Sequence, residues 1–389
     1  MTHGWKIVSL GDVCVIEKTK YKDDELPYVG MEDIVGGIGK FVGSREPKKV
    51  GSSTFQFTPE HLLYGRLRPY LNKVLLPDFE GHCSSEIFPL LPKAELDKSF
   101  LFYWITSEQV VKEINHTCTG TRMPRANVKE VLKFDIPIPP IEEQKCIVAI
   151  LDEAFAGIDT AIANTKKNLA NARELFESYL DSIFTERPEG WGSKRFGDLT
   201  EVQSGGTPLK SKKDYWNGEI AWYSSGELND VYTKASNNKI TELGLNNSNT
   251  KLFPSGSLLI GMYDTAALKM SVLDRKAAFN QAIAGAKPNA DIDLIFIMYA
   301  INAAKPEILS LRRGVRQKNL SLGKIKDIII PIPDIAEQRN IVSEISALKE
   351  QVQRLEYIYQ QKLTSLSELK QSLLQKAFSG ELMTGGKTS

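Results

Sequence analysis

Two long stretches of the chain carry apolar residues three or four positions apart. In the second stretch they are Ile341, Ile345, Leu348, Val352, Leu355, Tyr359, Leu366, Leu369 and Leu373. The first stretch has the same stripe, made of Ile147, Leu151, Phe155, Ile158, Ile162, Leu169, Leu175, Tyr179 and Ile183, with only Gly157 to weaken it. This spacing predicts two long helices that bury their stripes on each other as a coiled coil. At ~1.5 Å per residue, a helix of about 43 residues is about 65 Å long.

A proline-rich string precedes each predicted helix. IPIPPIEEQ begins at Ile136 and IPIPDIAEQ begins at Ile330, an offset of 194 residues (330 − 136). Because these prolines exclude a helix interior and a central strand, we expect an extended linker here. Acidic residues follow the prolines in both strings, as suits the first turn of a helix. We therefore expect the helices to begin at about Ile141 and Ile335.

The two halves of the chain share a frame but differ in their loops. Trp5 matches Trp191 at an offset of 186 (191 − 5), whereas Leu62 matches Leu258 at 196 (258 − 62). Compared with the offset of 194, the first value implies about eight extra residues in the stretch 199–221. In both halves, segments rich in Tyr, Ile, Val and Phe are bounded by Gly, Pro and Asn, as is typical of strands.

This repeat predicts an α/β (α+β) fold made by tandem duplication of a globular α/β domain followed by a long helix. The two helices are expected to pack as an antiparallel coiled coil. The expected parts are a globular domain at 1–140, a central helix at 141–186, a second globular domain at 187–334, a distal helix at 335–382 and a disordered tail at 383–389.

Three strings give the chain a family resemblance. They are the helix openings PIPPIEEQ and PIPDIAEQ, the ending SLLQKAFSGEL (residues 372–382), and GGTP…YW…AWYSSGEL (residues 205–228). In this order and spacing, over essentially the whole chain, they resemble the specificity (S, HsdS) subunits of Type I restriction-modification systems.

The resemblance implies two target recognition domains, each reading one half of a split, asymmetric site in double-stranded DNA. It implies that the helices set the distance between the two readers. It also implies partners, namely two adenine-methylating modification subunits and restriction subunits that act as translocase and nuclease. Because the two halves of this chain differ in loop length and side chains, we expect the two half-sites to differ as well.

Charge and composition are compatible with this interpretation. The formal net charge is +1, but residues 200–326 hold 17 Lys or Arg against 11 Asp or Glu, and residues 141–186 hold 4 against 9. The globular part is therefore the basic one, as local DNA contacts require. The four cysteines and four histidines show no metal-ligand spacing, so we expect no metal site. With no apolar run long enough for a membrane span or a secretory signal, we expect a cytoplasmic protein.

The sequence contains no recognisable catalytic motif. An adenine methyltransferase needs Asn or Asp before Pro-Pro-aromatic, but Pro139 and Pro140 lie between two isoleucines. Asp135, Glu143 and Lys145 superficially resemble a nuclease set, yet the repeat favours a helix start for them. The terminal TGGKTS string lacks the first glycine of a phosphate-binding loop. We therefore expect a non-catalytic chain without a cofactor.

The candidate DNA contacts are Arg, Lys and Tyr residues on loops. They are Arg66, Arg68, Arg122, Arg125, Lys210, Lys212, Lys213, Tyr215, Arg312, Arg313, Arg316 and Lys318. Such side chains grip phosphates or read base edges in the major groove, although each of them, taken singly, is more readily an ordinary surface charge. Arg122 and Arg316 occupy equivalent repeat positions, so they suit phosphate binding or fold support better than the reading of different bases.

A rival interpretation of the whole chain is a scaffold whose duplicated domains bind protein.

Overall fold

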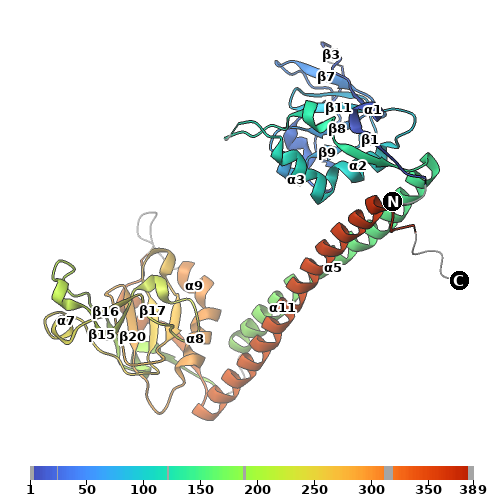
Figure 1. The fold of residues 1–389 in the computed structure, drawn as a ribbon. Coiled ribbons are helices and arrows are strands. Elements are labelled where there is room, and N and C mark those ends of the chain that lie inside the picture. Colours follow the sequence, from blue (N-terminus) through green and yellow to red (C-terminus); the bar gives the residue numbers. More distant parts are fainter. Residues whose placement is uncertain (1–3, 24, 121, 187–189, 311–318, 384–389) are drawn as a thin grey trace. The chain divides into compact units, whose positions relative to one another are not determined.

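The two apolar stripes form the helices α5 (Ile141–Thr185) and α11 (Ile335–Ser379), each of 45 residues. This computed structural model describes residues 4–23, 25–120, 122–186, 190–310 and 319–383. The chain divides into two units (Figure 1), which we call unit 1 (Met1–Lys167 with Tyr359–Ser389) and unit 2 (Asn168–Ile358). Each unit joins one globular domain to a part of both long helices.

Unit 1 contains two four-stranded sheets among its described residues. The first is antiparallel, in the order β2 (Cys14–Ile16), β11 (Ile87–Pro92), β8 (Leu62–Gly65) and β9 (Val74–Leu75). The second has the order β3 (Lys20–Tyr21), β7 (Thr54–Phe57), β10 (Gly81–Ser84) and β4 (Tyr28–Val29). A ribbon pairs β5 (Ile34–Val35) with β6 (Lys40–Phe41). The α-helices of the domain are α1 (Leu10–Val13), α2 (Lys98–Thr106), α3 (Glu108–His116) and α4 (Val128–Val131), and the 3-10 helices are η1 (Met31–Asp33) and η2 (Pro69–Leu71).

Unit 2 follows the same plan. Its first sheet has the order β14 (Val202–Ser204), β20 (Ile283–Ala286), β17 (Leu258–Gly261) and β18 (Met270–Val272). Its second has the order β16 (Asn238–Ile240), β15 (Trp216–Tyr223) and β19 (Ala278–Phe279). The α-helices are α6 (Phe196–Leu199), α7 (Glu242–Asn246), α8 (Leu294–Ala303), α9 (Lys305–Ser310) and α10 (Leu322–Lys326), and the 3-10 helices are η3 (Lys213–Tyr215), η4 (Ser225–Glu227) and η5 (Asp264–Ala266).

The first sheets of the two units correspond strand by strand, and the second sheets share one parallel pair. In unit 1, β4 pairs in parallel with β10, and in unit 2 the end of β15 pairs in parallel with β19. The first sheets, β2-β11-β8-β9 and β14-β20-β17-β18, have the same order and direction. The mixed α/β fold and the tandem duplication predicted from the sequence are thereby confirmed.

The proline strings form edge ribbons. As predicted they are extended, and each also pairs with the strand that opens its domain. β12 (Asp135–Ile138) pairs with β1 (Lys6–Ser9), and β21 (Ile329–Ile332) pairs with β13 (Gly192–Arg195), both antiparallel. A two-stranded ribbon tolerates prolines because each strand leaves one edge unpaired. The ribbons bring the first and last strands of each domain together at the N-terminal end of the long helix that follows it.

The glutamine that recurs in the two helix openings ties each helix to its domain. Gln144 and Gln338 are both fully buried. The Oε1 atom of each accepts the backbone N–H of a helix N-cap residue, Asp97 or Asp293, at 2.8 Å in both units. Their Nε2 groups donate to proline carbonyls within the proline strings, at 2.9 and 3.0 Å. The glutamine is thus a structural residue, which explains why it recurs at the same place in both repeats.

Two further contacts repeat at the same junction. The indole N–H of Trp5 donates to Glu143, and that of Trp191 donates to Glu337, both at 3.0 Å. These bonds confirm that the acidic residues serve the helix start and its docking on the domain.

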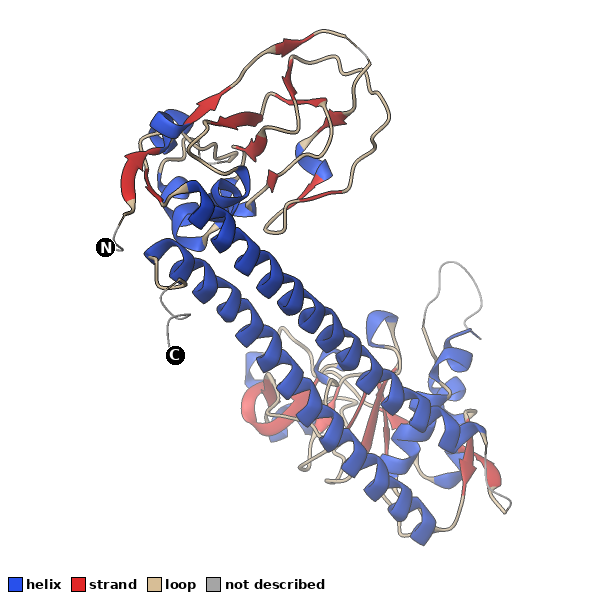
Figure 2. Ribbon diagram, turned by 90° about the vertical axis from the view of Figure 1, so that its right-hand side faces the viewer, coloured by secondary structure: helices blue, strands red, loops and turns tan. Residues whose placement is uncertain are grey.

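Within each unit, the segments of α5 and α11 lie side by side and run antiparallel (Figures 1 and 2). In unit 2, Arg173 pairs with Glu356. Tyr179 lies further along α5 and bonds Glu344, which lies earlier in α11. In unit 1, Lys370 bonds Asp159 at 3.1 Å. The antiparallel coiled coil is confirmed inside both units.

Not every residue of the predicted stripe lies in the seam. Leu175, Leu355 and Leu369 are 62%, 40% and 47% exposed. A stripe of apolar residues three or four apart drifts around a helix, so some members turn away from the partner. None of the helices in the described residues has an apolar stretch that would cross a membrane.

The C-terminal end of a long helix completes the core of each domain. Phe378 at the end of α11 meets Phe100 edge-on in unit 1, with ring centroids 5.2 Å apart. Phe184 at the end of α5 meets Phe296 in unit 2 at 5.4 Å. All four residues are buried or packed against buried residues. Each globular domain therefore depends on the helix that ends on it.

Candidate nucleic-acid interface

Both domains contain the same backbone arrangement at the end of the first sheet. In unit 1, the N–H of Arg66 donates to the carbonyl of Glu86, and the carbonyl of Arg66 accepts the N–H of Ala126, both at 2.9 Å. In unit 2, Met262 makes the same two bonds, with Ala282 at 2.9 Å and with Leu320 at 2.7 Å. Three chain segments that lie far apart in the sequence are thus joined in the same way in both units.

The side chains at these equivalent positions are different. In unit 1, Glu86 accepts the Nε–H groups of Arg66 and Arg125, at 3.0 Å and 2.9 Å. The matching backbone positions of unit 2 hold Met262 and Ala282, which cannot form such a pair. The Arg66–Glu86–Arg125 cluster is therefore particular to unit 1.

Electrostatics hold this cluster in its charged form. Burial alone would raise the pKa of the Glu86 carboxyl, but the hydrogen bond from Arg125 and the charges of Arg66 and Arg125 outweigh it. The net result is a pKa below the usual value for glutamate. The hydrogen bond and charge of Glu86 in turn raise the pKa of Arg125. Glu86 thus orients two guanidinium groups at the surface, where they retain unused N–H donors.

A small hollow of about 390 Å³ lies beside this cluster. Arg66 and Arg125 line it, together with Lys18, Lys129 and the ring of Phe88. The Lys18 ammonium lies over this ring at 4.1 Å from its centroid, and the Arg66 guanidinium lies at 5.1 Å. A cationic hollow with an aromatic floor suits an anionic or base-bearing ligand. Sequence analysis did not single out Lys18, Lys129 or Phe88, because single residues of these types carry no signal before the fold gathers them.

Arg68 and Arg122 are exposed near this cluster. Arg68 has a positive φ of 50° and its N–H donates to the carbonyl of Pro124 at 2.7 Å. That bond connects the loop after β8 with the loop that carries Arg122 and Arg125. The structure therefore brings the four arginines predicted for the first domain to two adjoining loops.

In unit 2 the predicted lysines lie on the inserted segment between β14 and β15. Lys210, Lys212 and Lys213 are exposed, and Tyr215 is half-buried. The carbonyl of Tyr215 accepts the N–H of Thr241 at 3.0 Å, so the segment is attached to the start of α7. The other predicted contacts of this domain, Arg312, Arg313, Arg316 and Lys318, lie outside the described residues.

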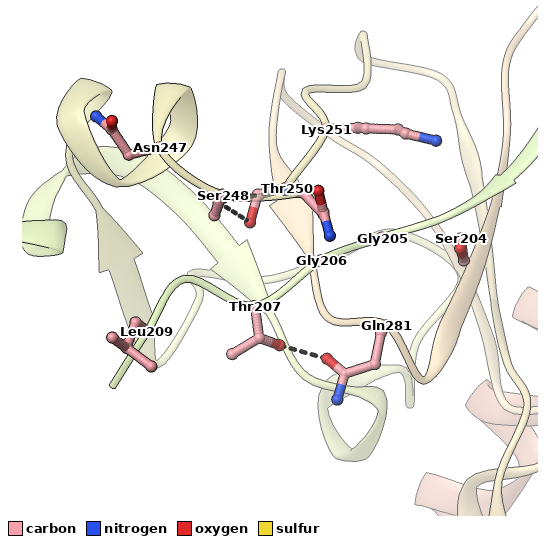
Figure 3. Close-up of a pocket in the computed structure, with 11 residues that line it drawn as sticks. Ser204, Gly205, Gly206, Thr207, Leu209, Asn247, Ser248, Thr250, Lys251 and Gln281 are labelled. Carbon is pink, nitrogen blue, oxygen red and sulfur yellow. Dashed lines mark hydrogen bonds between the residues drawn. The ribbon is translucent and has the colours of Figure 1, made fainter. Parts of the chain in front are cut away.

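Beside the inserted segment lies a wide groove of about 1000 Å³ (Figure 3). Its walls come from the end of β14, the loop after α7 and the turn between β19 and β20. They carry hydroxyl and amide side chains, among them Thr207, Asn247, Asn249 and Gln281, with Lys251 as a cation. Sequence analysis missed these residues. The Gly-Gly-Thr string of the insertion was the one signal in the sequence that pointed to this place.

This architecture defines a protein with two copies of an α/β domain, each followed by a long helix. The sequence pattern of the Type I restriction modification DNA specificity domain matches it twice, over residues 2–171 and 188–364. The chain therefore belongs to the Type I restriction-modification DNA specificity family, and its role is DNA sequence specificity. The two matches also confirm the duplication.

Curated relatives carry the same family name. The EcoR124I/EcoR124II specificity subunit of Escherichia coli is 26% identical over 286 residues, which is 68% of this chain and 67% of the relative. The EcoDI specificity subunit of Escherichia coli is 30% identical over 135 residues, and this match spans 35% of the chain and 30% of the relative.

Solved structures share the fold. The HsdS subunit from Thermoanaerobacter tengcongensis is 21% identical, with a TM-score of 0.69 over 98% of both chains. A chain from a structure that addresses complex assembly and conformational transition of the type I R-M system is 21% identical, with a TM-score of 0.81 over 97% of this chain and 98% of that one.

Proposed function

We propose that this chain is the non-catalytic DNA-reading subunit of a Type I restriction-modification complex. The globular domains at 1–140 and 187–334 each read one half of a split site in double-stranded DNA. Two adenine-methylating subunits and the restriction subunits then act on the site that the chain has chosen. As part of a complex that acts on cellular DNA, the chain works in the cytoplasm.

One observation carries the proposal that the half-sites differ. The two domains keep the same backbone hydrogen bonds around Arg66 and Met262, yet the side chains there are charged in one domain and apolar in the other. A reader of bases needs a fixed backbone and variable side chains, because the base edges differ while the duplex geometry stays the same. Two identical half-sites would instead favour two identical sets of side chains.

Single-molecule sequencing of host DNA with and without the gene tests this function. The expected result is the loss, in the deletion strain, of one adenine-methylation motif with two different halves separated by unread bases. Restoring the gene on a plasmid should restore the same motif. An unchanged methylation pattern would overturn the proposal and favour a role in protein binding.

A further inference from the structure

The groove of unit 2 has the chemistry of a base-reading surface. Thr207, Asn247, Asn249 and Gln281 offer both donors and acceptors. None of the described residues that line the groove is acidic, and Lys251 is the one cation among them. A phosphate accepts hydrogen bonds only, so a phosphate site is built mainly from donors and positive charge. A base edge in the major groove presents donors and acceptors side by side, which amide groups match.

Gln281 is the amide that the structure holds in place. Its Oε1 atom accepts the hydroxyl hydrogen of Thr207 at 2.5 Å, and Figure 3 shows the two side chains pointing toward each other. This bond uses one lone pair of Oε1. Among the described residues, the second lone pair of Oε1 and both hydrogens on Nε2 have no hydrogen-bond partner. A fixed amide loses less side-chain entropy when it binds, which favours recognition.

The turn that carries Gln281 is itself fixed. The N–H of Asn280 donates to the carbonyl of Tyr223 at 3.0 Å, and the side chain of Asn280 accepts the N–H of Ala282 at 3.1 Å. On the other wall, the N–H of Gly206 donates to the carbonyl of Phe279 at 2.9 Å. Main-chain bonds therefore join this turn to the β14 wall of the groove and to the end of β15.

Two glycines allow this close approach. A Cβ atom on Gly205 would lie 2.2 Å from the carbonyl oxygen of Phe279, and one on Gly206 would lie 2.5 Å from the carbonyl of Asn249. These are backbone atoms, so they cannot move aside as a flexible side chain would. The Gly-Gly-Thr string therefore brings the β14 end, the loop after α7 and the turn of Gln281 into one surface.

We propose that Gln281 reads an adenine of the half-site recognised by the second domain, and that Thr207 positions it. The Nε2 group of Gln281 would donate to N7 of the adenine while Oε1 accepts a hydrogen from its exocyclic N6 amine. The exposed Lys210, Lys212 and Lys213 on the neighbouring segment supply the phosphate contacts that hold the duplex in register. This assignment rests on the proposed function, because it names a base contact within the half-site.

The test is single-molecule sequencing of DNA methylated by the complete system with the chain carrying Gln281→Ala. We expect one position of one half-site to lose its preference for A·T, with discrimination falling roughly 5- to 150-fold, the equivalent of one bidentate contact. Gln281→Glu should move the preference at that position from adenine toward cytosine, because a carboxylate accepts from the cytosine N4 amine. The other half-site should be unchanged in both variants.

Three further variants separate reading from positioning. Thr207→Val should relax the same position as Gln281→Ala, though less, and Thr207→Ser should restore it by keeping the hydroxyl. Gln203→Ala is the matched control, since Gln203 precedes Ser204 on β14 and points to the opposite face of the strand. It should leave the motif intact.

If Gln281→Ala abolishes methylation, binding of the purified complete complex to duplexes with each half-site base replaced decides the matter. A loss that is selective for one position supports the assignment, and an equal loss for all duplexes overturns it. An unaltered motif in Gln281→Ala and Gln281→Glu also overturns the assignment while the proposed function stands. If the wild-type complex methylates no split motif, the proposed function itself is contradicted.

Discussion

The turn that connects the second sheet to the first is built alike in the two units but serves different chemistry. In unit 1 the turn after β10 carries Glu86, which gathers Arg66 and Arg125 into a charged cluster. In unit 2 the turn after β19 carries Gln281, which faces a groove of amides and hydroxyls. One backbone bond fixes both turns in the same way: the carbonyl of Glu86 accepts the N–H of Arg66, and the carbonyl of Ala282 accepts the N–H of Met262, both at 2.9 Å. Duplication has kept the frame and has replaced the side chains at the place where recognition requires change.

This difference between the turns distinguishes the residues that maintain the fold of the repeat from those that determine what each domain recognises. Gln144 and Gln338 recur because they hold a helix to its domain. The residues of the turns do not recur. In unit 2, Gln281 lines the groove, and in unit 1, Glu86 bonds Arg66 and Arg125, which line the hollow. Identity between the halves therefore marks structure, and divergence at equivalent backbone positions marks recognition.

The largest effect is expected from breaking the common frame. Gln144→Leu leaves the N–H of Asp97 and the carbonyls of Glu95 and Pro139 without their partner in a buried place. We expect the free energy of unfolding to fall by about 2 to 4 kcal/mol. Gln338→Leu should cost a similar amount in unit 2. Denaturant unfolding followed by circular dichroism measures both.

The exposed Gln351 on α11 provides the control, and Gln351→Leu should change stability by about 0.5 kcal/mol or less. If Gln144→Leu and Gln338→Leu were as mild as this control, the glutamines would not be part of a shared frame.

An intermediate effect is expected from the charged cluster of unit 1. Glu86→Gln removes the negative charge that Arg66 and Arg125 share, and should cost about 1 kcal/mol at neutral pH because the cluster is partly exposed to water. Glu80→Gln, an exposed carboxyl in the same domain, should cost less. Denaturant unfolding of wild type, Glu86→Gln and Glu80→Gln at one pH gives their free energies of unfolding. Equal stability of Glu86→Gln and wild type would contradict the role of the cluster.

The same cluster gives a pH dependence. Since the folded-state pKa of Glu86 lies below its ordinary value, its stabilisation is complete above the ordinary pKa of glutamate and is lost as the pH falls through the lowered value. The difference in unfolding free energy between wild type and Glu86→Gln should therefore shrink on acidification. A difference in unfolding free energy that grows as the pH falls would contradict a lowered pKa of Glu86.

The smallest effect is expected at Arg122, which is exposed and belongs to the equivalent repeat pair. If it grips phosphate, Arg122→Ala should weaken binding of the complete complex to specific and random duplexes alike and lower the salt slope by about one. Arg122→Lys keeps the charge and should keep the slope. Fluorescence anisotropy at several salt concentrations measures the affinity for both duplexes and its salt slope. A loss of affinity confined to the specific duplex would make Arg122 a base reader instead.

The sequence predicted the long-range plan because periodic signals carry it. The apolar stripes and the proline strings place the helix starts at Ile141 and Ile335, where the structure has them. Gly380, which follows α11, has a φ of 79°, a conformation that suits the residue after a helix end.

The sites were less predictable, because they are assembled from distant segments. Arg66 and Arg125 could be named as exposed cations, but nothing local in the sequence shows that Glu86 lies between them. The groove around Gln281 combines residues of β14, the loop after α7 and the β19–β20 turn. Amides and hydroxyls of this kind are common on any surface, so only their convergence distinguishes them.

One measurement tests the central claim that a shared frame carries two different readers. Residues 187–334 would be replaced by a second copy of residues 1–140, and the DNA methylated by the complete system would be sequenced at single-molecule resolution. We expect a motif whose two halves carry the same bases in inverted order, because both readers would then have the Arg66–Glu86–Arg125 cluster. A motif that retains two different halves would contradict it.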